Sequence, residues 1–560
     1  MKTIIYQLLP RLFGNDNTNR IWNGTRKENG CGLLNNITLD ALQAIKQLGV
    51  TYVWYTGLLE HATQTDYSSY GISRDHRAMV KGKAGSPYAI KDYYDIDPDL
   101  ASEPSLRFGE FQELVRRTHS VDLKIVMDFV PNHVARQYRS DHHPKGVADL
   151  GKGDNLNKSF SPQNNFYYIP NTLLQCRFDM RSDEDAAFWE LPAKATGNDC
   201  FSPFPGQTDW YETVKLNYGV DYQDNCSHHF DPIPSTWYKM RDILCFWTRQ
   251  RIDAFRCDMS EMVPCEFWQW VIPQVKELNP EILFIGEVYN PALYHDYVFR
   301  GHFDYLYDKV GLYDTLRAVT VGTKWASDIT KCWQSIEDIK NHMLNFLENH
   351  DEQRIASDFF AGKGEKGRAA LVVSVCMGTN PFMLYFGQEL GERGMDKEGF
   401  SGLDGRTSIF DYWSVQTVCQ WRNKERYDGG QLSEESQKLR AFYVKVLQLA
   451  TQEKALSEGQ FFDLMYVNCN NSQFNASRTY AFIRSYNNQY IFIIVNFGDQ
   501  PVSQSVKVPA HAFEFLGIKP GEYSANELLT DTRLTVSLWP DKTFDIRISP
   551  YNAVMLKICG

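Results

Sequence analysis

Four segments of the sequence place carboxylic acids beside histidine, arginine or glycine, each at the end of a short apolar run. Two carboxyl groups about 5–5.5 Å apart can break a glycosidic bond with retention, one as an ionised nucleophile and the other as a proton donor. The segments suit this chemistry if the fold brings them to one rim. They are Asp128-Phe129-Val130-Pro131-Asn132-His133, Asp253-Ala254-Phe255-Arg256-Cys257-Asp258, Gly286-Glu287 and Glu348-Asn349-His350-Asp351.

Asp258 and Glu287 are the two acids best placed for these roles. Side chains alternate along a strand, so Arg256 and Asp258 share one face while Cys257 points to the other. A guanidinium favours the ionised form of a neighbouring carboxylate, which makes Asp258 the expected nucleophile. Glu287, flanked by apolar residues and a glycine, is the expected acid. An isolated Asp–Arg pair is more often structural, and only the joint pattern favours catalysis.

The elements that must position these acids alternate between β-rich runs and amphipathic helical stretches, which is typical of a parallel sheet built from βα units. A closed barrel of eight parallel strands places its active site at the C-terminal ends of the strands. The expected fold is therefore an α/β TIM (β/α)8 barrel. Its eight predicted strands are residues 3–9, 50–56, 123–129, 252–257, 282–287, 303–307, 344–349 and 381–386.

Two regions depart from the barrel pattern. Within residues 134–234 the alternation is lost and Gly, Asn, Asp, Pro and aromatic residues dominate, which predicts a subdomain inserted after the third strand. The catalytic barrel would then comprise residues 1–133 and 235–454. Residues 455–560 alternate in short runs and predict a C-terminal antiparallel β-sandwich, for which a packing role is favoured over a sugar-binding surface.

Composition restricts the partners of the chain. Asp and Glu outnumber Lys and Arg by 69 to 58 without a basic cluster, so neither nucleic acid nor a membrane surface is expected. No stretch approaches the roughly 20 apolar residues that span a bilayer. The N-terminal residues are predicted to form a strand rather than a signal peptide, and the 12 cysteines contain no CxxC pair. We expect a cytoplasmic protein with reduced thiols.

Taken together, the four segments resemble the signature segments of the α-amylase family, in the same order and at plausible intervals. The resemblance extends to residues 86–98, which are similar to the family's loop after strand two, and to residues 381–389, which are similar to its eighth strand. It implies a retaining glycoside hydrolase that requires no cofactor. The implied catalytic residues are Asp258 (nucleophile), Glu287 (acid/base) and Asp351 (third acid), and the implied substrate contacts are Tyr88, Asp128, His133, Arg256 and His350.

Two departures from the family pattern concern the acceptor side and a calcium site. Many family members have Lys-His after the nucleophile, whereas this chain has Met259-Ser260-Glu261-Met262. In the insertion, the family's calcium-binding Asp corresponds to Lys215. We therefore expect no structural calcium beside Asn132, with the Lys215 ammonium reaching toward Asn132 and backbone carbonyls instead. If the alignment there is shifted, a nearby acid could serve as ligand: Asp209, Asp221 or Asp224.

The leading functional hypothesis is an α-glucan hydrolase that cleaves α-1,4 bonds of starch, glycogen or maltodextrin. A 4-α-glucanotransferase would use the same acids, and the segment around Lys215 is similar to the neopullulanase and cyclomaltodextrinase branch. An inactive amylase-like binding protein is disfavoured because all three acids are present. The sequence leaves open the chain length of the substrate, the preference between α-1,4 and α-1,6 bonds, and the oligomeric state.

Overall fold

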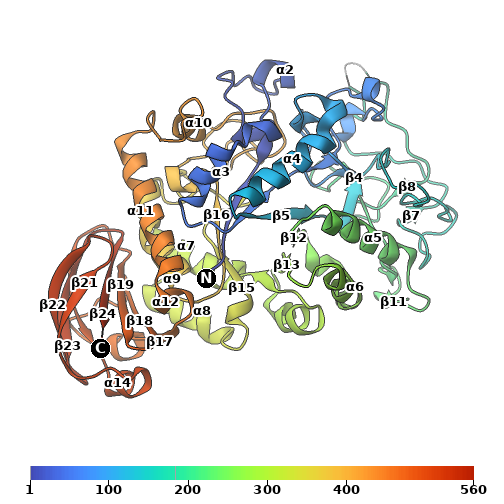
Figure 1. Ribbon diagram of the computed structural model, residues 1–560. Helices are drawn as coiled ribbons and strands as arrows, with labels where there is room; N and C mark the ends of the chain where they lie inside the picture. The colour runs from blue at the N-terminus through green and yellow to red at the C-terminus, as the bar shows by residue number, and fades with distance from the viewer. Residues whose placement is uncertain (1, 183–184, 560) are drawn as a thin grey trace.

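The computed structural model describes residues 2–182 and 185–559 (Figure 1). Its centre is a closed barrel in which the strands neighbour one another in the order β1-β16-β15-β14-β13-β12-β5-β2, all paired in parallel. This confirms the predicted barrel. The strands are β1 (Ile4–Leu8), β2 (Tyr52–Tyr55), β5 (Lys124–Phe129), β12 (Ala254–Cys257), β13 (Leu283–Gly286), β14 (Tyr305–Tyr307), β15 (Met343–Phe346) and β16 (Phe382–Tyr385).

Most of the observed strands are shorter than predicted, and the difference at their C-terminal ends matters for the site. The run predicted over residues 344–349 forms a strand only to Phe346, and the run over residues 282–287 ends at Gly286. Glu287 and the segment from Glu348 to Asp351 therefore lie in the loops above the barrel. Residues at the C-terminal ends of the strands and in the loops that follow them form the active-site face of such a barrel.

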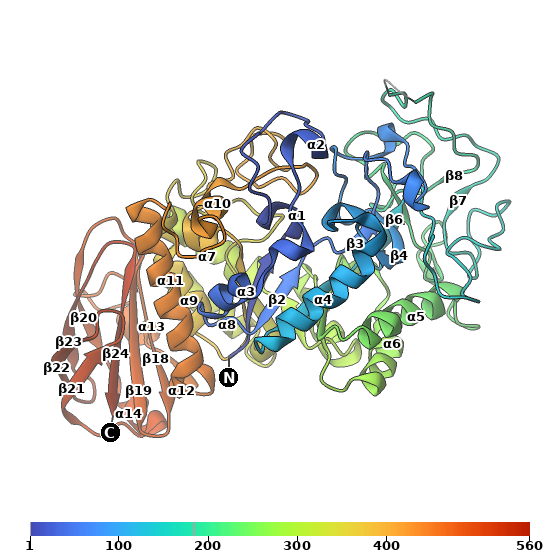
Figure 2. The ribbon, with the colours of Figure 1, turned by 45° about the horizontal axis from the view of Figure 1, so that its top comes forward.

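Helices surround the barrel, and their ends follow local capping rules. Thr38 accepts a hydrogen bond from the Ala41 amide at the start of α3, and Ser433 does the same for Ser436 at α11. Figure 2 shows α4, α5 and α6 along the outside of the barrel. The main helices are α3 (Leu39–Lys46), α4 (Arg107–Ser120), α5 (Ser235–Arg249), α6 (Cys265–Leu278), α7 (Asp314–Val321), α8 (Ile329–Ser335), α9 (Arg368–Cys376) and α11 (Glu434–Gln452).

The interior of the barrel is filled by side chains of the strands themselves. Tyr52 and Trp54 of β2 belong to a buried cluster with Ile285 of β13, Tyr307 of β14 and Phe346 of β15. A much larger cluster joins the outer faces of the strands to the helices. The barrel is therefore a packed core, and the polar residues at its mouth rest on a rigid base.

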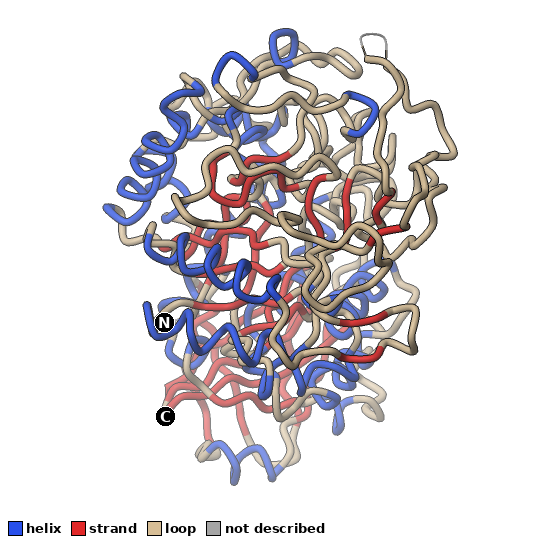
Figure 3. The backbone as a smooth tube through the Cα atoms, turned by 90° about the vertical axis from the view of Figure 1, so that its right-hand side faces the viewer, coloured by secondary structure: helices blue, strands red, loops and turns tan. Residues whose placement is uncertain are grey.

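The insertion between β5 and α5 is built mainly of loops, which Figure 3 shows in tan. It follows the third barrel strand, as predicted, although positions 183–184 within it lie outside the described residues. Short two-stranded sheets organise it, and a further one stands in the loop after β2. The pairs are β6 (His133–Ala135) with β9 (Thr213–Lys215), β7 (Tyr168–Ile169) with β8 (Ala193–Lys194), β10 (Val220–Asp221) with β11 (Ser227–His228), and β3 (Leu59–His61) with β4 (Ile90–Ile96).

The C-terminal region forms a six-stranded antiparallel sheet and a two-stranded sheet, which confirms its predicted class. Helix α9 of the barrel contacts β19 and β24. No helix among the described residues is long and apolar enough to cross a membrane. The larger sheet contains β17 (Gln460–Asp463), β18 (Thr479–Tyr486), β19 (Gln489–Asn496), β24 (Asn552–Cys559), β21 (Gly521–Glu527) and β22 (Thr532–Leu538); the smaller contains β20 (Val502–Lys507) and β23 (Thr543–Ile548). The remaining helices are α1 (Pro10–Phe13), α2 (Arg26–Asn29), α10 (Gln416–Arg422), α12 (Lys454–Ser457), α13 (Met465–Asn468) and α14 (Ala510–Leu516).

Candidate active site

Arg256 is the centre of the site, because its fully buried guanidinium joins acids from three of the predicted segments. Its Nη1 lies 2.6 Å from Asp258 Oδ1 and 3.4 Å from Asp128 Oδ1, and its Nη2 lies 2.8 Å from Glu287 Oε2. Arg256 stands directly opposite Asp128 in the pairing of β12 with β5. The structure thus brings Asp128, Asp258 and Glu287 together around one cation.

Backbone hydrogen bonds continue beyond the strand ends and fix the two principal acids. The Asp258 amide donates to the Phe129 carbonyl at 2.9 Å, and the Glu287 amide donates to the Cys257 carbonyl at 3.1 Å. Met259 then takes a left-handed conformation, with φ of 45° and ψ of 41°. This turn points its amide at Glu287 Oε2, 2.8 Å away. Such a conformation is uncommon for a residue other than glycine.

Burial and mutual repulsion oppose the ionisation of the acids at the barrel mouth. Burial raises the pKa of Asp258 well above its ordinary value; Arg256 opposes this shift, whereas charges on Glu287 and Asp128 add to it. Burial likewise raises the pKa of Asp128 to about 6, and partial burial followed by the charge on Glu287 raises that of Asp351 to about 7. One guanidinium faces several carboxyl groups, and this arrangement favours protonation of one of them, as a retaining pair requires.

His350 and Tyr88 form the other side of the mouth. Their rings stack with centroids 5.1 Å apart, and the Tyr88 hydroxyl lies 2.6 Å from His350 Nε2. The amide nitrogen of Gln7 lies 2.9 Å from Nδ1 and can only donate, which assigns the ring proton to Nε2. Burial lowers the pKa of His350 well below its ordinary value, so the ring is neutral. Nε2 also lies 3.1 Å from Asp351 Oδ2.

His133 lies where β5 leads into the insertion, and its environment also keeps it neutral. Burial, followed by the charge on Lys215, lowers the pKa of His133 to about 3. Its ring meets the edge of Trp210 with centroids 5.3 Å apart. Among the described residues, no hydrogen bond or ion pair joins His133 to Asp258 or Glu287; its ring instead lies 3.2 Å from the Asn132 amide nitrogen, through Nδ1.

Lys215 occupies the junction between barrel and insertion. Its ammonium donates to Asn132 Oδ1 at 2.9 Å, which confirms the hydrogen bond expected from the sequence. The acid that pairs with it is Asp199, 2.5 Å away, which the sequence analysis did not identify. The three acids considered there, Asp209, Asp221 and Asp224, instead accept hydrogen bonds within local turns.

The residues at this junction do not fit a calcium ion. Calcium takes about six to eight oxygen ligands, whereas Lys215 is buried and places a cation between the oxygens of Asn132 and Asp199. The ammonium also lies 5.0 Å from the centre of the Tyr222 ring, a favourable place for a cation. Lys215 therefore satisfies the oxygens that a metal would otherwise bind.

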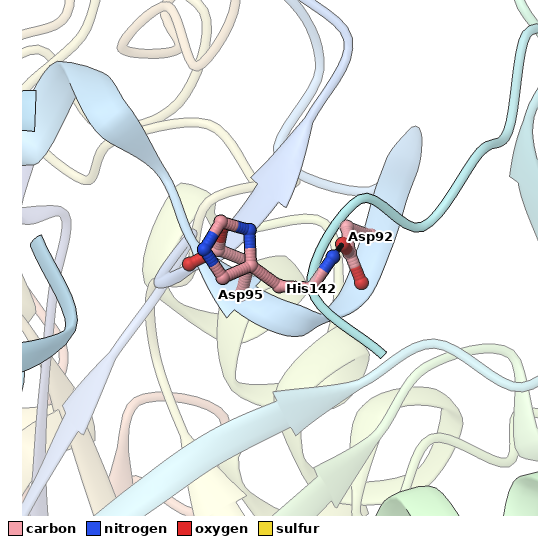
Figure 4. Close-up of side chains that lie close together, drawn as sticks. All are labelled: Asp92, Asp95 and His142. Atoms are coloured by element: carbon pink, nitrogen blue, oxygen red, sulfur yellow. Dashed lines mark hydrogen bonds and ion pairs between the residues drawn. The ribbon is translucent and has the colours of Figure 1, made fainter. Parts of the chain in front are cut away.

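A second cluster of potential metal ligands lies away from the mouth, between β4 and the insertion (Figure 4). Asp92, Asp95 and His142 bring their ligand atoms within 4.8 Å of one another. However, Arg107 donates to Asp95 Oδ2 from Nε at 2.9 Å, so a cation already occupies this side. Asp92 accepts hydrogen bonds from Ser140 Oγ and from three backbone amides. We interpret the cluster as a structural network that anchors the insertion.

Several residues that complete the site were not identified from the sequence. Trp54 Nε1 donates to Asp128 Oδ2 at 2.9 Å, and Arg256 Nε donates to the Tyr307 hydroxyl at 3.3 Å. Trp54 and Tyr307 belong to predicted strands, and their inward positions could have been inferred from the alternation of the strand side chains. The Tyr289 hydroxyl donates to Glu287 Oε1 at 2.7 Å. No signal in the sequence indicated that contact.

Comparison with known proteins agrees with this geometry. The family model described as "Alpha amylase, catalytic domain" matches residues 7–442. Alpha-amylase 3 of Dictyoglomus thermophilum is 23% identical over 82% of this chain and 78% of its own length. Neopullulanase 2 of Thermoactinomyces vulgaris is 21% identical over 91% of this chain and 71% of its own. A maltogenic alpha-amylase, AmyB from Thermotoga neapolitana, shares the fold with a TM-score of 0.62 at 18% identity, covering 100% of this chain and 99% of its own.

Proposed function

The chain belongs to the α-amylase family of glycoside hydrolases, and from this premise we propose that it cleaves α-1,4-glucosidic bonds by double displacement. Asp258 acts as the nucleophile, Glu287 as the acid/base and Asp351 as the third acid. The observation that supports these roles best is the shared contact of Asp258 and Glu287 with Arg256. One fixed guanidinium holds both carboxyl groups at the mouth of a rigid barrel.

In the first step, Glu287 gives its proton to the glycosidic oxygen while Asp258 attacks the anomeric carbon, and the bond to the leaving sugar breaks. In the second step, Glu287 takes a proton from water, which displaces Asp258 and releases the sugar with its α configuration retained. Arg256 balances the charge that moves between the two acids. Neutral His350 and the carboxyl group of Asp351 are placed to hold sugar hydroxyls, whose hydrogen bonds strengthen as the ring flattens.

For the substrate we propose maltooligosaccharides derived from starch or glycogen, in a reducing, cytoplasmic setting. Relatives that match most of this chain include proteins named as alpha-amylases, a neopullulanase and cyclomaltodextrinases. A neopullulanase or cyclomaltodextrinase activity is therefore the second candidate. Lys215 favours it as well, because the segment around that residue is similar to this branch of the family.

Product analysis on maltoheptaose, pullulan and a cyclodextrin tests the proposal. Hydrolysis of maltoheptaose gives only shorter sugars, whereas glucanotransfer also gives longer ones. Faster turnover of pullulan or the cyclodextrin would select the second candidate. If purified protein released no reducing ends from any of the three, while Asp258→Asn protein behaved identically, the chain would be a binding protein and the proposed function wrong.

A further inference from the structure

The two oxygens of the Glu287 carboxyl group have unlike surroundings. Oε2 lies 2.8 Å from Arg256 Nη2 and accepts a hydrogen bond from the Met259 amide, also at 2.8 Å. Within the part of the chain that the structure describes, Oε1 instead accepts one hydrogen bond, from the hydroxyl of Tyr289 at 2.7 Å. A guanidinium and a peptide N–H can only donate hydrogen bonds. With two donors already directed at it, Oε2 has no room for a proton of its own.

This arrangement leaves only one position on the carboxyl group for the catalytic proton. A carboxylate oxygen has two lone-pair sites, and the Tyr289 hydroxyl occupies one of those on Oε1. The other site of Oε1 remains for the proton. We propose that Glu287 carries its catalytic proton on Oε1 and that Tyr289 is the positioning residue that fixes this choice. This inference rests on the proposed role of Glu287 as the acid/base.

Tyr289 also acts selectively on the reaction. When the Oε1 proton moves to the glycosidic oxygen and the bond to the leaving sugar breaks, Glu287 becomes a carboxylate. The hydrogen bond from the Tyr289 hydroxyl then becomes charge-assisted and stronger, so it stabilises the transition state more than the ground state. In the second step the proton of water returns to the same site. Burial and the charge on Glu287 raise the pKa of Tyr289 well above its ordinary value, so its hydroxyl keeps its proton.

Glu261 holds Tyr289 in place. Its Oε2 accepts hydrogen bonds from the backbone amides of Tyr289 and Asn290, both at 3.0 Å. Glu261 thus fixes the loop that follows the acid/base. Glu261 belongs to the segment after the nucleophile, where many family members have Lys-His, and in this chain the segment holds that loop. The acid at this position therefore contacts the loop backbone, and through it orients the Tyr289 ring.

The test is Tyr289→Phe, measured on maltoheptaose and on α-maltosyl fluoride. Fluoride departs with little protonation, so its rate should stay within about 3-fold of wild type, whereas kcat on maltoheptaose should fall roughly 10- to 100-fold with KM nearly unchanged. The pH at which activity on maltoheptaose falls on the alkaline side should move upward by about one unit, because the carboxylate has lost a donor.

Tyr297→Phe is the matched control, since the hydroxyl of the buried Tyr297 likewise donates one hydrogen bond, but to the Val263 carbonyl at 2.8 Å. It should change neither the ratio of the two rates nor the alkaline limb. Equal losses on both substrates for Tyr289→Phe, or an unmoved alkaline limb, would overturn the inference. If that variant does not fold, Glu261→Ala decides by the same two readouts. A wild-type protein inactive on both substrates would instead refute the proposed function.

Discussion

At the scale of single residues, Arg256 determines how charge is divided at the barrel mouth. Its contact with Asp258 favours the carboxylate form, while burial acts in the opposite direction. A second contact, with Glu287, ties the acid/base to the same cation. The charge that leaves one carboxyl group during catalysis therefore appears on a group bound to the same guanidinium, at little cost in reorganisation.

Substitution of the two acids should separate their roles. Asp258→Asn should abolish turnover of every substrate, because no covalent intermediate can form. Glu287→Gln should lower turnover of maltoheptaose by about 10²–10⁴-fold, the usual contribution of general acid–base catalysis. On an α-glucosyl fluoride, single-turnover kinetics of Glu287→Gln should retain much of the first step. Equal and complete loss of that step in both variants would contradict the assignment.

The sequence allowed the carboxyl groups and Arg256 to be identified because strand alternation places residues two apart on one face. Contacts made by loop residues could not be predicted in this way. Tyr289 and Glu261 meet only because the chain turns after β12 and β13, and Gln7 of β1 reaches His350, which follows β15, past the intervening strand β16. Such contacts depend on three-dimensional placement, which periodicity does not describe.

At the scale of elements, the strands and the position of the insertion were predictable, but the internal structure of the insertion was not. Eight apolar runs bounded by turn residues gave the barrel, since buried parallel strands are continuous hydrophobic runs. The insertion is held by side-chain to backbone hydrogen bonds and short sheets, which leave no period in the sequence. The hydrogen bond from Lys215 to Asn132 was nevertheless predictable, because a buried ammonium requires hydrogen-bond acceptors.

Chelation tests the role of Lys215 at the junction of β6 and β9. We expect EDTA to leave both activity and melting temperature nearly unchanged, because no folded-state ligand is withdrawn. Lys215→Met should lower the free energy of unfolding by about 2 kcal/mol, since the oxygens of Asn132 and Asp199 lose a charged donor. Thermal unfolding with and without chelator measures both effects. A fall in melting temperature with EDTA that calcium reverses would show this interpretation of Lys215 to be wrong.

At the scale of the whole molecule, the buried Arg484 joins the C-terminal sheet to the barrel. Arg484 of β18 donates to the carbonyls of Met377 at 2.6 Å and Gly459 at 2.8 Å. Lys2, before β1, donates to the neighbouring Gly378 carbonyl at 2.7 Å. The antiparallel class of this region was predicted correctly from its short alternating runs, but this junction was not, because its acceptors are backbone groups that carry no sequence signal.

Lys2 makes the stability of the molecule depend on pH. Burial, followed by the charge on Arg484, lowers the pKa of Lys2 from 10.5 to about 7. Between pH 7 and pH 10.5 the unfolded chain binds more protons at Lys2 than the folded chain does. The free energy of unfolding therefore rises with pH across this range, reaches its full value above pH 10.5, and falls again as the pH is lowered to about 7. The difference in melting temperature between wild type and Lys2→Met should therefore shift in favour of wild type from pH 7 to pH 9.5, by roughly a few degrees. A constant difference across this range would contradict the account.

The most direct test of the central claim is the configuration of the sugar when it is first released. If Asp258 and Glu287 act as a retaining pair, proton NMR during the first minutes of maltoheptaose hydrolysis should show the α-anomer, with the β-anomer appearing only later by mutarotation. The same experiment with Asp258→Asn should show no product signal. Initial release of the β-anomer by the wild-type protein would rule out the double displacement and, with it, the roles given to both acids.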